Sequence, residues 1–155
     1  MRAINDIIER IVVALLTLAF AALVCVVGLQ VLARNVLQVP MIWTPDLAQL
    51  LFAWCIFLGA AIAFRRSGHY EVNIWPTSGP LAQIPRSVAF VGGVIVIGVL
   101  FYYGIDMTQR AMLRTNPSLG ISELWFFISI PISGGLMALF LAERVIARLS
   151  RSATQ

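Results

Sequence analysis

The stretch that decides the fold is IVVALLTLAFAALVCVVGLQVLA, residues 11–33, in which 23 consecutive positions carry no charged side chain. An α-helix rises 1.5 Å per residue, so this stretch would be about 35 Å long, enough to cross the hydrocarbon core of a bilayer. Three further uncharged apolar runs follow at residues 47–64, 87–105 and 124–142. The sequence therefore predicts an all-α membrane protein with four transmembrane helices.

Composition points to the same class of protein. Apolar residues make up 60% of the 155 residues and charged residues 12%, whereas soluble domains carry about 25% charge. Four spans of about 20 residues leave only loops and tails, so we expect one four-span membrane domain over residues 1–155. The single histidine excludes a bis-histidine haem and argues against a zinc site, so we expect no cofactor and no metal.

The distribution of arginine predicts the orientation in the membrane. All eleven basic residues are arginines, and they flank the apolar runs. This pattern is typical of topology signals and does not indicate nucleic-acid binding. If the four spans alternate in direction, three arginines fall on one side (Arg34, Arg110 and Arg114) and eight on the other (Arg2, Arg10, Arg65, Arg66, Arg86, Arg144, Arg148 and Arg151). Both termini are therefore predicted to be cytoplasmic.

The loop between the second and third spans, residues 65–86, is the least regular part of the chain. Its apolar residues Ile74, Trp75, Leu81 and Ile84 are compatible with a short segment lying in the plane of the membrane interface. A plain loop explains the same residues equally well.

Ionisable residues are absent from the interiors of all four runs. The carboxylates nearest to them, Asp46, Asp106, Glu123 and Glu143, lie at span ends. A membrane protein that couples ions by itself normally carries an embedded ionisable group, so this pattern argues against a stand-alone transporter. A chain with one histidine at a span end also cannot assemble a nucleophile, a base and an orienting group, so we do not expect an enzyme.

Small residues form a stripe on two of the spans. Cys55, Gly59 and Ala63 recur every four residues in the second span, and Gly134, Ala138 and Ala142 do so in the fourth. Such stripes let membrane helices approach closely. We expect helix contacts at Gly59, Ala63, Gly134 and Ala138, either within this chain or with a partner, because periodicity does not distinguish the two.

The segment from residue 34 to residue 72 resembles the signature region of the small membrane subunit, the Q subunit or DctQ-like family, of tripartite ATP-independent periplasmic (TRAP) transporters. The matching elements, in order, are Arg34, Trp43 followed by Asp46, the run Phe57-Leu58-Gly59-Ala60-Ala61, then Arg65, Arg66, Gly68 and His69. A weaker likeness continues through residues 115–121, Trp125 and Pro131. One departure is Pro45, which stands where the family often has the first of two consecutive acids.

The resemblance implies a scaffold subunit in the bacterial inner membrane. It would support a large membrane (M) subunit driven by a sodium gradient, and help to dock a periplasmic substrate-binding (P) protein that carries a carboxylate-bearing solute such as a C4-dicarboxylate or an acidic sugar. Its partners would be those two proteins and the lipid bilayer, with no nucleic acid. The alternative is a stand-alone small transporter or a structural protein with four spans, acting as a homo-oligomer.

Topology and resemblance together give two further sets of candidate residues. On the periplasmic side they are Arg34, Trp43, Asp46, Arg110 and Arg114. We expect Arg34 and Asp46 to meet directly or through a partner chain, since they lie at adjoining ends of consecutive spans. Arg65, Arg66 and His69 are the candidate anchors on the cytoplasmic side. His69 either is solvated or anchors its loop to the large subunit or to the third span.

Overall fold

The structure is a computed structural model that describes the backbone of residues 2–66 and 83–152 and the side chains of residues 5–66 and 90–146. Its elements are α1 (Arg2–Leu32), the π-helical turn η1 (Ala33–Leu37), α2 (Trp43–Arg66), α3 (Gln83–Ala111), α4 (Leu124–Phe127) and α5 (Ser129–Ser152). Four helical stretches in the described chain are long and apolar enough to cross a membrane, namely Asn5–Leu37, Trp43–Arg66, Phe90–Ala111 and Leu124–Ile146. The prediction of an all-α protein with four spans is confirmed. The predicted interfacial segment falls mostly on residues 67–82, outside the described residues.

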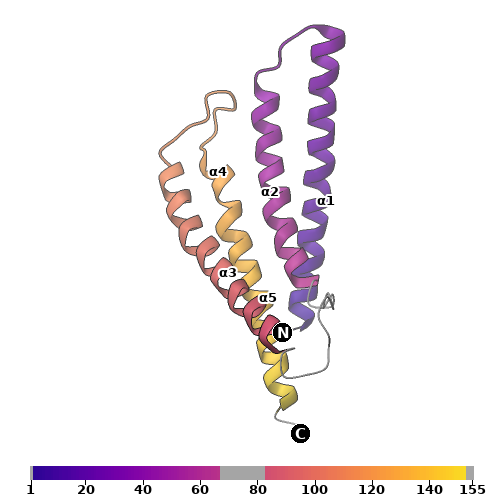
Figure 1. The fold of residues 1–155 in the computed structure, drawn as a ribbon. Helices are drawn as coiled ribbons and strands as arrows, with labels where there is room; N and C mark the ends of the chain where they lie inside the picture. Colours follow the sequence, from indigo (N-terminus) through magenta and orange to yellow (C-terminus); the bar gives the residue numbers. More distant parts are fainter. Residues whose placement is uncertain (1, 67–82, 153–155) are drawn as a thin grey trace.

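The helices stand in an open row and do not form a closed bundle (Figure 1). α1 packs against α2, α2 against α5, and α5 against α3. The N-terminal end of α1 and the C-terminal end of α5 lie at the same end of the row, which we call the terminal end. The opposite end, which carries the two connections between residues 33–43 and 111–124, is called the loop end.

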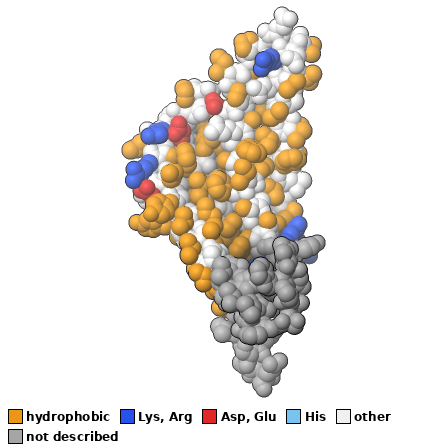
Figure 2. All heavy atoms as spheres, viewed as in Figure 1, with side chains coloured by type: hydrophobic (Ala, Val, Ile, Leu, Met, Phe, Trp, Pro, Cys, Tyr) orange, Lys and Arg blue, Asp and Glu red, His pale blue; other side chains and the backbone are white. Residues whose placement is uncertain are grey.

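Two clusters of buried side chains form the core. Val12, Leu58, Ile62 and Phe140 join α1, α2 and α5, and Ala61, Ile97 and Met137 join α2, α3 and α5. Much of the remaining apolar surface is exposed, as the broad hydrophobic face in Figure 2 shows. Side chains outside the core are therefore available to lipid or to partner chains.

The crossing of α3 and α5 depends on two glycines. A Cβ atom at Gly104 would lie 3.0 Å from Ile130 and Pro131, and one at Gly134 would lie 3.1 Å from the backbone nitrogen of Phe101. Pro131 also explains the break between α4 and α5, because proline has no N–H to donate to the carbonyl of Phe127. The helix therefore changes its hydrogen bonding at Ile128, just before the crossing.

The helices extend beyond the predicted spans, most of all at the start of α1 and at the end of α5, which reaches Ser152 instead of residue 142. The first helix begins near residue 2 instead of residue 11, since its polar first turns contact other helices. It also continues through η1 and stops at Gln38, whose φ of 53° places it in the left-handed region.

Candidate functional site

Charged side chains from three helices meet at the terminal end, in a group that we call the ionic cluster. Arg65 at the end of α2 is its centre, with a side chain only 12% exposed. Its guanidinium lies 2.5 Å from Asp6 and 2.8 Å from Glu9 on α1, and 3.8 Å from Glu143 on α5. The neighbouring Arg66 pairs with Glu9 at 2.9 Å.

Further contacts hold the same arginine in place. Arg65 also donates a hydrogen bond to the backbone carbonyl of Asn5, and its Cζ lies 5.0 Å from the centre of the Phe140 ring. The Asn5 amide donates to Glu143 at 2.7 Å, so that α1 and α5 are joined to each other as well as to α2. The ionic cluster thus ties together three of the four spans.

Arg144 on α5 caps the C-terminal end of α2. It donates hydrogen bonds to the carbonyl oxygens of Phe64 and, at 2.7 Å, Arg65, and its Cζ lies 5.0 Å from the centre of the Phe64 ring. The last carbonyls of a helix have no partner within the helix and carry partial negative charge. The Arg144 guanidinium supplies both the hydrogen-bond donors for these carbonyls and the opposite charge.

Of the three candidate anchors, the structure brings two together. Arg65 and Arg66 lie in the ionic cluster and bind their own chain, whereas His69 lies outside the described residues. Sequence reasoning missed Asn5, Asp6, Glu9 and the pair Glu143 and Arg144. A signal for Asp6 and Glu9 existed, since acids just before one span and arginines just after the next meet when two helices form a hairpin.

At the loop end, the two predicted partners do not meet. The described residues show no ion pair between Arg34, which is exposed, and Asp46, which is half-buried. Trp43 begins α2 and is 40% exposed. The turn before it is held by the buried hydroxyl of Thr44, which donates to the carbonyl of Met41 at 2.9 Å. Contact of Arg34 and Asp46 through a partner chain stays a prediction.

The second connection at the loop end is a compact turn. The Asn116 side chain accepts hydrogen bonds from the backbone N–H groups of Ser118 and Leu119 at 2.9 and 3.1 Å. A β-bridge pairs Thr115 with Ser122, and Gly120, with a φ of 66°, closes the turn. This network gives residues 114–123 a defined shape.

Both candidate arginines near this turn are exposed. Arg110 pairs with Asp106 one helical turn away at 3.0 Å. Arg114 lies at the foot of the turn, where its carbonyl accepts from the N–H of Glu123 at 2.9 Å.

The two small-residue stripes behave differently. Gly134 is buried against Phe101 of α3, as expected for a helix contact, but Ala138 is exposed. Nothing lies within 4 Å of a Cβ built at Gly59, and Ala63 is exposed. The stripe on α2 therefore makes no close helix contact in the described chain, and contact with a partner there stays a prediction.

Three hydroxyl groups within the spans are hydrogen-bonded to the backbone of their own helix. The hydroxyls of Thr17, Ser129 and Ser133 donate to carbonyls three or four residues earlier at 2.8 to 2.9 Å. No group of three or more metal-ligating side chains occurs among the described residues. These three hydroxyls are therefore already used in hydrogen bonds within their own helices.

Comparison with known proteins identifies the family. Residues 23–151 match the model of the DctQ component of tripartite ATP-independent periplasmic transporters. The chain is 32% identical over 146 residues to the sialic acid TRAP transporter small permease protein SiaQ of Vibrio cholerae, covering 93% of this chain and 82% of SiaQ. It is 25% identical over 119 residues to the C4-dicarboxylate small permease protein DctQ of Pseudomonas aeruginosa, covering 72% of this chain and 56% of that protein.

A third relative has a different size. The sialic acid TRAP transporter permease protein SiaT of Haemophilus influenzae is 28% identical over 120 residues, which are 76% of this chain but only 20% of SiaT. A segment like this chain therefore also occurs within a much longer permease polypeptide. With four apolar helices and the match over most of its length, the chain belongs to the DctQ family of TRAP transporter small permease subunits, a transport component of the bacterial inner membrane and not an enzyme.

Proposed function

We propose that this subunit is a scaffold that holds the large transport subunit in the membrane and helps to dock the periplasmic substrate-binding protein. The observation that carries the proposal is the open row of helices. Each outer helix packs mainly on one neighbour, and large apolar side chains remain exposed along α1 and α3. A row of this kind offers a wide lateral surface to a second membrane protein.

The relative from Haemophilus influenzae supports a large membrane partner. There, a segment similar to this chain makes up a fifth of one permease polypeptide. Two units joined in one chain are held at high local concentration, which favours a standing contact between them. For the present protein, that partner would be a separate large subunit.

The charge distribution supports cytoplasmic termini. The terminal end of the row contains the backbone positions of eight arginines, and the loop end those of three. Because cytoplasmic segments carry the excess of arginine and lysine, the loop end would face the periplasm. A substrate-binding protein would then reach Trp43, Asp46, Arg110, Arg114 and the compact turn at residues 114–123.

A carboxylate-bearing solute is the proposed cargo of the assembled transporter. Relatives named for sialic acid and for C4-dicarboxylates both support this class. The solute would pass through the large subunit, because a charge at the bilayer centre costs at least about 2.5 kcal/mol and the described spans of this chain contain no embedded ionisable group.

Reconstitution tests the scaffold role. Liposomes with this chain alone should show no flux of sialic acid or C4-dicarboxylate, and adding the large subunit and the binding protein should make uptake depend on this chain. Flux through the chain alone would contradict the proposal and favour a homo-oligomeric transporter.

Cysteine labelling tests the orientation separately. In a variant in which Cys25 and Cys55 are replaced by alanine, Leu113→Cys at the loop end should react with a membrane-impermeant maleimide added to intact spheroplasts. Leu113 suits this test because it is 92% exposed. A cysteine replacing Ile7, which is 58% exposed near the terminal end, should react only after the membrane is opened. The reverse pattern would place the termini outside.

A further inference from the structure

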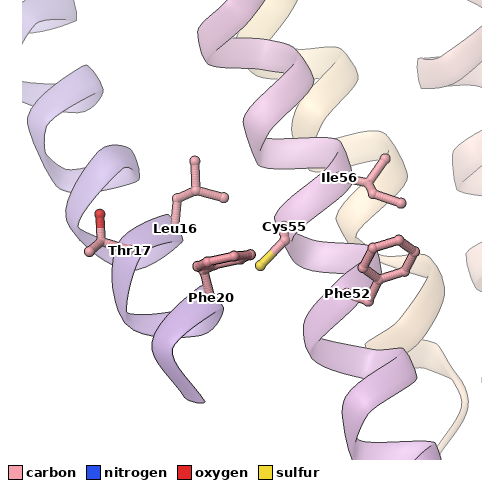
Figure 3. Close-up of a pocket in the computed structure, with 6 residues that line it drawn as sticks. All are labelled: Leu16, Thr17, Phe20, Phe52, Cys55 and Ile56. Carbon is pink, nitrogen blue, oxygen red and sulfur yellow. The ribbon is translucent and has the colours of Figure 1, made fainter. Parts of the chain in front are cut away.

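An apolar groove lies between α1 and α2, about half-way along the pair (Figure 3). Its volume is about 460 Å³, and it opens to the outside of the helix pair. Six residues line it: Leu16, Thr17 and Phe20 from α1, and Phe52, Cys55 and Ile56 from α2. Figure 3 shows Phe20 and Cys55 pointing toward each other across the groove. The hydroxyl of Thr17 is already bonded to the carbonyl of Val13, so the groove suits a hydrocarbon occupant.

Beyond the lining residues of the groove, small side chains continue along α2 toward the terminal end. Gly59 and Ala63 follow Cys55 at intervals of four residues, and residues four apart lie on one face of a helix. A Cβ at Gly59 would meet nothing within 4 Å, and Ala63 is exposed. Gly59 and Ala63 therefore form a strip of α2 with little side-chain bulk that spans about 12 Å beyond Cys55, at 1.5 Å per residue. We call the groove and this strip together the channel.

An arginine lies on α1 on the terminal-end side of the groove. Arg10 precedes Thr17 by seven residues, two helical turns, so both lie on one face of α1. It is exposed and, unlike Arg65, forms no ion pair with a carboxylate among the described residues. Arg10 is also the last charged residue before the apolar run 11–33.

The length of the channel fits one leaflet of a bilayer. Ten residues separate Arg10 from Phe20, which is about 15 Å along a helix and half of a hydrocarbon core of about 30 Å. The arginine would bind the anionic headgroup of a phospholipid, and the apolar channel beside it would hold an acyl chain of the same lipid. Arginines at this level attract anionic headgroups by about 1 kcal/mol each.

We propose that the groove between α1 and α2 holds one acyl chain of an anionic phospholipid, with its phosphate bound by Arg10, in the leaflet on the side of the chain termini. Lipid, and not a partner chain, would then cover the open face at Gly59. A protein occupant would explain the apolar groove, but would give no role to Arg10, two helical turns from Thr17 and without an ion pair among the described residues.

Native mass spectrometry of the complex purified through a tag on this chain tests the proposal. The complex is exchanged into detergent and titrated with phosphatidylglycerol, and separately with phosphatidylcholine of the same acyl chains. Arg10→Gln should weaken phosphatidylglycerol retention about fivefold, as loss of one surface charge contact predicts. Gly59→Leu, which fills the channel, should weaken it about tenfold.

Two control variants match these changes outside the groove. Arg34→Gln removes an exposed arginine at the other end of the first helix, and Gly28→Leu enlarges another glycine with nothing within 4 Å of its Cβ. Both should retain phosphatidylglycerol as the unchanged protein does. A phosphatidylglycerol carrying a photoreactive group near the acyl terminus should label peptides containing Phe20 or Phe52.

Three results would overturn the proposal. The first is equal retention of the two lipids by the unchanged complex. The second is unaltered phosphatidylglycerol binding in both Arg10→Gln and Gly59→Leu. The third is loss of the large subunit from the Gly59→Leu complex with lipid retention unchanged, which would show that a protein chain occupies the groove.

Discussion

Replacing Arg65 by glutamine should destabilise the protein more than any other single change of a charged residue described above. The arginine is 12% exposed, and the side chains of Glu9 and Glu143 are 22% and 17% exposed. Removing the arginine would leave Glu143 without its cation in a largely dry site and would leave Glu9 paired with Arg66 alone. Asp6 contributes little to the expected effect, because its side chain is 61% exposed and water screens the pair.

The size of the effect follows from the burial. Breaking a buried ion pair by removing one partner costs about 3–5 kcal/mol, mainly because the other charge is left behind. The exposed pair of Arg110 with Asp106, with side chains 78% and 47% exposed, provides the matched control. An exposed pair of this spacing contributes only about 0.3–0.5 kcal/mol. Arg65→Gln should therefore cost several times more than Arg110→Gln.

Thermal unfolding in detergent, followed by the fluorescence of a thiol-reactive dye at the two cysteines, measures both variants. The double variant Arg65→Gln with Glu143→Gln should recover part of the lost stability, since it no longer strands that carboxylate. If Arg65→Gln unfolds at the same temperature as Arg110→Gln, the ionic cluster does not hold the three helices together and the reasoning is refuted.

Three other changes probe separate features. Gly104→Val should lower stability by about 1–3 kcal/mol because its side chain would meet Ile130 and Pro131. Gly98→Val, where a Cβ has nothing within 4 Å, should cost much less in the same unfolding assay. Equal costs would argue against a close crossing of α3 and α5 at Gly104. Asn116→Ala should speed proteolysis of the turn at residues 114–123 by a protease added on the loop-end side of the membrane, while Asn116→Asp, which keeps the accepting oxygen, should not. Arg144→Met should destabilise by about 1–3 kcal/mol through the two uncapped carbonyls of α2, and an unchanged unfolding temperature would show that water replaces the cap.

Hydropathy alone predicted the number of spans, because an uncharged run of about 20 residues has few alternatives to a membrane helix. It did not predict where the helices begin and end. The first helix begins near residue 2 because Asp6 and Glu9 are paired with arginines of α2, and a tertiary contact of this kind has no signature within a short window of sequence. The same holds for Arg144, whose partners are backbone carbonyls 79 and 80 residues away.

The small-residue stripes show a second limit of sequence reasoning. Gly134 and Gly59 have equivalent patterns, yet only Gly134 contacts another helix closely. Both α2 and α5 lie between two neighbours in the row, but the face of Gly134 is turned toward Phe101 of α3, whereas a Cβ at Gly59 would meet nothing within 4 Å. Periodicity identifies a face that permits close approach, but the arrangement of helices decides what approaches it. Gly104 was missed because it belongs to no stripe.

The ionic cluster has a consequence for how the protein is made. Asp6, Glu9 and Arg65 leave the ribosome early, but Glu143, Arg144 and the ring of Phe140 belong to α5, which is synthesised after α1, α2 and α3. Until α5 enters the membrane, Arg65 lacks its aromatic neighbour and the final carbonyls of α2 lack their cap. A chain cut short before residue 140 would retain these unfinished contacts, a defect that membrane proteases can recognise. The contacts of the ionic cluster are therefore completed only when α5 joins the helices made before it.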